Sequence, residues 1–308
     1  MGRATLMSRQ NPGGNFIIND YEKVAGNEWF VDSGHAAAVD ALGAGMDPDH
    51  PLATFAYLCT NFASMSRAGT ADDVCYVAPR HAETNATASG ITQPAGLKLV
   101  GQGRGARRPT FTFSAVGSTW LLSGANAAIE NIIVTATAAV TKLFSVTAAG
   151  VTIDRVDYTE GSGLPLQFLL TSALADQLTI KNCRHVAVTA GASAQVWIEI
   201  VGTDDALIID NVFHLALNNA AGSYTIRAST AAVRAIIQRN TIVQTGGTTQ
   251  VSALSLVAAS TGYVSDNRVA ANVTTLAGTV ALASAYGANN LTSHTVNKAG
   301  INDPVVDS

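Results

Sequence analysis

The stretch LKLVGQGRGARRPTFTF, residues 97–113, places three glycines among three arginines, a combination that can hold phosphate. The glycines do not follow the Gly-x-Gly-x-x-Gly spacing of a dinucleotide loop, and no Lys-Ser or Lys-Thr pair completes a triphosphate loop. An alternating strand pattern follows, so we expect no helix N-terminus facing a phosphate. We therefore expect Arg104, Arg107 and Arg108 to form an exposed basic loop, either solvated or docked on an acidic protein partner, with no cofactor.

Carboxylates could supply the acid and base of a polysaccharide-cleaving enzyme if several of them converged on one groove. Asp204 and Asp205 are adjacent, but the pair lies in an expected turn. Asp154, Asp157 and Glu160 are close in sequence without an accompanying base at a spacing that suggests catalysis. We expect no catalytic residues, and we expect that the chain is not an enzyme.

A repeat of short strands must position all of these side chains. Seven segments each carry a β-prone run that leads into a polar position, and these positions follow one another at steps of 23 to 29 residues. Another short strand recurs 11 to 14 residues before each of the clearer ones. A unit this small cannot bury its apolar face alone, but stacked copies can. The repeated polar positions are Asn131, Arg155, Asn182, Asn211, Asn240, Asn267 and Asn290.

The repeat predicts an all-β fold, a parallel β-helix with coils of about 23–30 residues. Asparagine suits its tight bends because it tolerates the left-handed backbone conformation. Leu52, Phe55, Cys59 and Phe62 recur at helical spacing and predict an amphipathic helix that covers one end. The expected organisation is an N-terminal arm (1–28), a capping segment (29–73), the β-helix (74–296) and a C-terminal tail (297–308).

Two histidines occupy equivalent positions in successive repeats. His185 and His214 each lie three residues after a repeat asparagine, so we expect them to stack on neighbouring coils, with Cys183 on the same face. Two histidines and one cysteine lack a fourth ligand for zinc, so we expect no metal site. A contact between subunits is the role that we predict for both histidines.

The strand VWIEI contains a second candidate contact. Alternation places Ile198 inward and both Trp197 and Glu199 outward. Arg227 occupies the position of Glu199 one coil later, so the two should pair on the surface. We predict that Trp197, Glu199 and Arg227 belong to a subunit interface, with a sugar-binding platform as the alternative.

Composition excludes several classes of protein. Hydrophobic residues make up 47% of the 308 residues and charged residues 13%, with a net charge of −4. A basic excess is absent, which argues against a nucleic-acid partner. We find no apolar run of about 18 residues that would predict a membrane span. The three cysteines have no disulfide-like spacing, as expected for reduced thiols.

The stretch PLATFAYLCTNF…DDVCYVAPRHAE…GLKLVGQGRGARRPTF resembles the opening of right-handed parallel β-helix proteins of the pectate-lyase type. It is also similar to β-helix proteins on the virions of tailed bacteriophages, whether capsid decoration proteins or tailspikes. Trp197, Ile198 and Glu199 resemble part of the Trp-Ile-Asp-His segment of pectate lyases, but the calcium-binding carboxylates and the arginine base have no counterparts. The resemblance therefore implies the fold more strongly than an activity.

From these observations we expect a non-enzymatic structural protein of a phage virion surface, assembled in the host cytoplasm. We expect a homotrimeric decoration or cement protein whose partners are itself and the major capsid protein, with no nucleic acid and no membrane. The alternative is a short tailspike or an enzyme that binds or depolymerises host polysaccharide.

Overall fold

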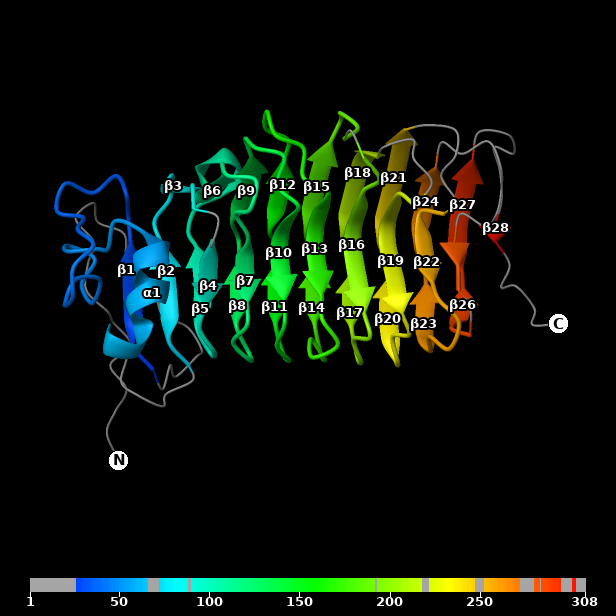
Figure 1. Cartoon of the computed structure of the whole chain (residues 1–308), viewed down its shortest axis with the longest axis horizontal. Helices are drawn as coiled ribbons and strands as arrows, with labels where there is room; N and C mark the ends of the chain where they lie inside the picture. Colours follow the sequence, from blue (N-terminus) through cyan, green and yellow to red (C-terminus); the bar gives the residue numbers. More distant parts are fainter. Residues whose placement is uncertain are drawn as a thin grey trace.

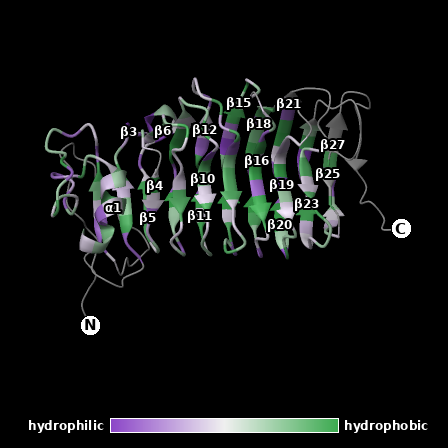
Figure 2. Ribbon diagram, in the orientation of Figure 1, coloured by the Kyte–Doolittle hydropathy of each residue, from purple (hydrophilic) through white to green (hydrophobic). Residues whose placement is uncertain are grey.

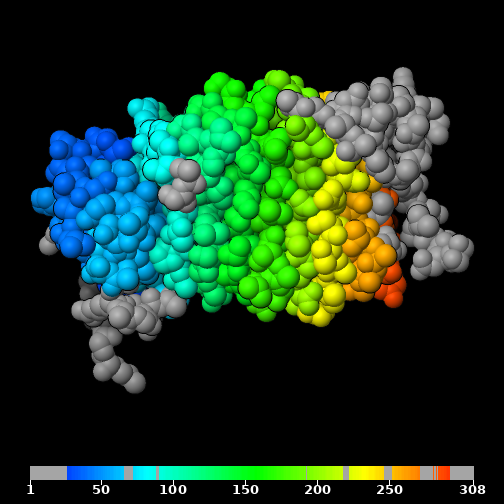
Figure 3. Space-filling model, viewed as in Figure 1, coloured from blue at the N-terminus to red at the C-terminus, as the bar shows by residue number. Residues whose placement is uncertain are grey.

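In the computed structural model, three parallel sheets run along one solenoid, which confirms the predicted β-helix (Figure 1). Successive coils follow one another along the long axis from the N-terminal to the C-terminal end (Figure 3). We call the sheets A, B and C, and each coil contributes its strands in the order A, B, C. The structure describes residues 26–65, 72–87, 90–191, 193–217, 222–246, 252–271, 280–282, 284–294 and 301–302.

Sheet A has ten strands within the described residues, and most of them alternate between an inward and an outward side chain. The inward column is aliphatic over its central coils, where Ile129, Ile153, Ile180 and Ile208 stack in register. Its strands are β1 Glu28–Val31, β2 Val74–Val77, β5 Lys98–Gly101, β8 Ala128–Glu130, β11 Thr152–Asp154, β14 Thr179–Lys181, β17 Leu207–Ile209, β20 Ala235–Gln238, β23 Gly262–Ser265 and β26 Tyr286–Ala288.

Sheets B and C close the solenoid, and hydrophobic residues follow the strands (Figure 2). Sheet B consists of β3 Ala82–Asn85, β6 Thr110–Phe113, β9 Ile133–Ala136, β12 Asp157–Thr159, β15 Arg184–Ala187, β18 Val212–Leu217, β21 Thr241–Gly246, β24 Arg268–Ala271, β27 Asn290–His294 and the antiparallel β28 Ile301–Asn302. Sheet C consists of β4 Ile91–Gln93, β7 Trp120–Leu122, β10 Lys142–Val146, β13 Gln167–Thr171, β16 Val196–Val201, β19 Tyr224–Thr230, β22 Leu254–Leu256 and β25 Val280–Ala281.

The bends on both sides of sheet A contain residues with positive φ. The prediction that the repeat asparagines occupy these bend positions is only partly correct. Asn131, Arg155 and Asn182 have the positive φ that we expected at the bend. From the next coil onward, the bend residue comes one position earlier, and the repeat asparagine itself is buried. These later bend residues are Asp210, Arg239, Asp266 and Asn289.

The buried asparagines form an amide ladder that runs along the last coils. The Asn240 amide donates to the Ile208 carbonyl (2.9 Å) and to Asn267 Oδ1 (3.0 Å), while Asn240 Oδ1 accepts from the backbone N–H (3.1 Å) and the amide (2.9 Å) of Asn211. Asn267 and Asn290 repeat the pattern one coil further on. The side chains thus satisfy backbone groups that a tight bend leaves without a ladder partner.

The helix α1 (Phe55–Met65) covers the N-terminal end, as predicted. Phe55 packs against Phe111 and Trp120, with ring centroids 6.3 and 5.4 Å apart. Glu83 accepts hydrogen bonds from the backbone N–H groups of Phe55 (2.7 Å) and Ala56 (2.9 Å), where a carboxylate favours the helix dipole. The solenoid also begins earlier than the expected Val74, because β1 pairs with β2 as a further strand of sheet A. Residues 1–25 of the expected arm and most of the expected tail lie outside the described residues.

Candidate functional site

The outward face of sheet A carries an apolar stripe at its C-terminal half. Leu207, Ile236, Tyr263 and Tyr286 are register partners on four successive strands. Ile236 is 38% exposed, Tyr263 41% and Tyr286 78%, so the stripe meets solvent in this chain. Ile209 lies beside it in the second outward column of the same sheet. Such a contiguous apolar row on an otherwise polar surface is typical of a contact site.

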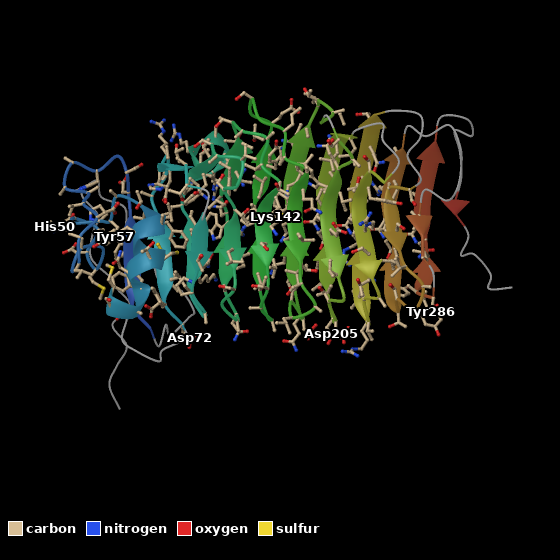
Figure 4. The ribbon with its side chains drawn as sticks, in the orientation of Figure 1. His50, Tyr57, Asp72, Lys142, Asp205 and Tyr286 are labelled. Carbon is tan, nitrogen blue, oxygen red and sulfur yellow. The ribbon has the colours of Figure 1, made fainter. Side chains whose placement is uncertain are left out.

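Paired charges flank the stripe on both edges. Arg234 binds Asp205 with two hydrogen bonds of 2.6 and 2.7 Å on one edge, and Arg239 binds Asp210 with two of 2.8 Å on the other. These hydrogen bonds lower the pKa of both carboxyls. Asp205 and Tyr286 both lie along the lower edge of the solenoid in Figure 4. An apolar centre with a neutralised polar rim has the anatomy of a protein interface.

A belt of alternating charge crosses the middle of the same face. Lys98 contacts Glu130 at 3.2 Å, and Arg155 also forms an ion pair with Glu130. Lys181 and Asp154 are register partners whose charged atoms lie 3.9 Å apart. The belt therefore carries both signs, and its charges are compensated within the chain.

Toward the N-terminus, sheet A becomes apolar again on its outward side. Phe30 and Tyr76 stack with ring centroids 5.9 Å apart, and Val100 follows them in the same column. Sheet A thus carries apolar residues toward both ends, in different outward columns, with a charged belt between them.

This face carries no reactive motif, so the sequence motifs did not predict it. The available signal was apolar residues on both sides of an inward isoleucine in a strand of only three residues, as in Leu207–Ile209. One buried side chain is expected in such a strand, and three apolar ones are present.

Sheet C holds a polar cluster on its outward side. Glu199 Oε1 accepts from Arg227 Nη2 at 2.6 Å, which confirms the predicted pair, and Glu199 Oε2 accepts from Gln167 Nε2 at 2.5 Å. The Arg227 guanidinium lies 5.3 Å from the centre of the Tyr224 ring. Glu199 is 8% exposed, so its charge is stabilised mainly by these partners rather than by water.

The predicted outward direction of Trp197 was wrong. Trp197 is fully buried, and its indole Nε1 donates to His185 Nδ1 at 2.7 Å. Five consecutive residues of β16 are buried, so burial does not alternate along this strand as it does along most strands of sheet A. Trp197 therefore cannot anchor a subunit contact from the surface of this chain.

The two histidines do not stack. His185 pairs in register with Phe213, whereas His214 pairs with Val186 and is exposed. The two histidines are offset by one register position, because Asn211 stacks on Cys183 and not on Asn182. His185 is buried in the interior, so its predicted role at a subunit contact is wrong, while that of His214 stays a prediction.

The basic loop contains a short 3₁₀ turn, η1 (Gly105–Arg107), with Arg104 and Arg107 exposed. Arg108 is instead used within the chain. Its guanidinium pairs with Asp157 and donates to the carbonyl of Arg155 at 3.2 Å, so it connects two coils that are separated by the coil of β9. Only Arg104 and Arg107 therefore remain as predicted docking residues.

The acidic side chains that could supply catalytic or metal chemistry are engaged in contacts within the chain. Asp205 is half of an ion pair, Asp157 holds Arg108, and Glu160 accepts backbone N–H groups of Val188 (2.5 Å) and Thr189 (2.9 Å). Within the described ranges, no three His, Cys, Asp or Glu side chains gather as metal ligands would. No helix in the described part of the chain has the length and apolar character to cross a membrane.

No known family model matches this chain, and no curated protein sequence matches it. Among solved structures, the chain is similar to a rhamnogalacturonan lyase at 13% identity and a TM-score of 0.40. The match covers 87% of this chain and 66% of the lyase, so the chain spans slightly less than two thirds of that enzyme. Our expectation that the chain is not an enzyme is corrected by this finding, because the similar protein is one. The match assigns no reaction to this chain.

Proposed function

We propose that this chain is a structural protein of a bacteriophage virion surface, of the capsid decoration type, that packs against protein through sheet A. The observation that carries the proposal is the apolar stripe with its rim of paired charges. Arg104 and Arg107 at the capped end supply a second contact, toward an acidic region of the major capsid protein. A homotrimer is the assembly expected from the sequence, and the molecular mass in solution distinguishes it from the dimer that we infer in the next section.

Intact particles provide the decisive test. Antibodies against the chain should label the heads of phage particles purified from the lysate that yields the protein. Ile236→Glu should lower the number of copies per particle by about tenfold or more, because it buries a charge in the contact. The matched control is Val188→Glu, since Val188 is 76% exposed and lies away from sheet A. A chain that stays in the soluble fraction, with no labelled particles, would contradict the proposal.

A second candidate function is the binding or cleavage of host polysaccharide at the cluster on sheet C. The supporting observation is a carboxylate, Glu199, held between an amide and a guanidinium beside the Tyr224 ring. Such a group offers hydrogen bonds and an aromatic surface to a sugar.

Purified host polysaccharide, incubated with wild type and with Glu199→Gln, tests this candidate. Loss of binding or of chain shortening in the variant, with an unchanged melting temperature, would support the sugar function over the structural one. Equal behaviour of the two proteins, with no shortening by either, would exclude it.

A further inference from the structure

We infer that two copies of this chain pack face to face through sheet A with their solenoids antiparallel. The inference rests on the proposed function, which assigns this face to protein contacts, and it adds the identity and orientation of the partner. The axis of such a dimer lies parallel to the strands, midway between β11 and β14. Each strand then faces the strand that lies equally far from this axis on its other side, so that β11 faces β14 and β8 faces β17. Each outward column of side chains faces the same column of the other copy.

The charged belt fits this arrangement. Five strands of sheet A lie on each side of the boundary between β11 and β14. Rotation about that boundary brings Asp154 of one copy opposite Lys181 of the other, and Lys181 opposite Asp154. Thr152 likewise comes opposite Thr179, so the centre of the interface holds two reciprocal ion pairs and matched threonines. An isologous contact requires this kind of self-complementarity.

The C-terminal stripe meets a row of mixed character on the N-terminal half in the same rotation. Leu207 of β17 comes opposite Ala128 of β8, Tyr286 of β26 comes opposite Glu28 of β1, and Tyr263 of β23 comes opposite Val74 of β2, which is itself only 6% exposed. Ile236 faces Lys98, whose aliphatic stem can cover it while the ammonium group holds Glu130 at 3.2 Å. The stripe of one copy thus gains apolar contacts from Ala128 and from the stem of Lys98 of the other copy.

The alternative rotation, about an axis parallel to the solenoid, fits less well. It places every strand opposite its own copy and exchanges the two outward columns. Asp154 would then face Thr152, and Lys181 would face Thr179, so the belt would gain no opposite charge. Tyr263 would face Ser265 instead of an apolar side chain.

The available area is adequate for a stable contact. Ten strands about 4.8 Å apart give a face about 43 Å long, and the five-residue spacing of the bends gives a width of about 16 Å. The product is roughly 700 Å² per copy, close to the about 800 Å² per partner of a standard interface.

Sedimentation and charge exchange test the inference. Wild type at tens of micromolar should sediment with twice the 31.7 kDa mass of the chain. Lys181→Glu should weaken the dimer by about tenfold, because it faces Asp154 of the partner copy, and Asp154→Lys with Lys181→Glu should restore it. Val188→Glu, on another part of the surface, should leave the dimer intact.

Cross-linking tests the orientation. A chain with Val100→Cys, mixed with one carrying Gln238→Cys, should join through a short bis-maleimide, because these positions face each other only when the solenoids are antiparallel. In the parallel arrangement they lie about 24 Å apart along the sheet. Wild type, with its native cysteines, is the background control.

A monomer, a trimer, or a dimer that the paired exchange fails to restore would overturn the inference. A dimer without the Val100–Gln238 cross-link would overturn its orientation. A monomeric chain that still labels phage heads would overturn this inference and leave the proposed function standing.

Discussion

At the scale of single residues, His185 is an ionisable group that the solenoid interior holds in its neutral form. His185 is fully buried, with its ring centroid 3.9 Å from that of Phe168 and 5.1 Å from that of Phe213. Its Nδ1 accepts from Trp197, so the proton of the neutral ring lies on Nε2. Burial lowers the pKa of His185 from 6.5 to about 3, because the charged form would lose its hydration.

This pKa predicts how stability depends on pH. Below about pH 6.5 the unfolded chain binds a proton at His185 that the folded chain excludes, so the free energy of unfolding falls as pH is lowered toward 3. The slope from this group approaches about 1.4 kcal/mol per pH unit. His185→Gln retains an acceptor for Trp197 and should remove that part of the slope.

Urea unfolding at several pH values between 7 and 4 measures the effect. The control is His214→Gln, since His214 is exposed and lies outside the core. Equal slopes for His185→Gln and wild type would show that His185 does not exclude the proton.

At the scale of elements, the sequence predicted the strands well because two constraints repeat in every coil. The inward column of sheet A requires one aliphatic residue, such as Ile153 or Ile180, and the bends require a residue that tolerates positive φ. Both leave a periodic trace. Asparagine recurs in the sequence for two different reasons, because Asn182 is a bend residue and Asn211 is a buried ladder residue. The register predicted from the asparagines is therefore wrong by one position between these two coils.

The missed orientation of Trp197 has a different cause. Alternation predicts direction only within a flat strand, because a bend lets consecutive side chains turn to the same side. Leu143 and Phe144 of β10 are also adjacent and both fully buried. A sequence pattern of period two does not show where two adjacent side chains are both buried, so it could not predict the burial of Trp197.

At the scale of the whole molecule, the candidate site follows from stacking. Each coil packs mainly against its two neighbours, so a residue type that recurs at one position becomes a column along the surface. The exposed stripe from Leu207 to Tyr286 is such a column, and a local motif search does not detect it. A terminal coil has one neighbouring coil instead of two, so the ends of the solenoid need another element to cover their apolar side chains.

The N-terminal end gives the last prediction. Phe55 is fully buried where α1 covers the first coils, and it contacts the rings of Phe111 and Trp120. Phe55→Ala should therefore lower the free energy of unfolding by about 3–5 kcal/mol, since it opens a cavity between the helix and the solenoid. Phe62→Ala on the same helix is the matched control and should cost less, because Phe62 is only partly buried. Chemical unfolding followed by tryptophan fluorescence compares the two, and a cost for Phe55→Ala no larger than that for Phe62→Ala would mean that α1 does not hold this end closed.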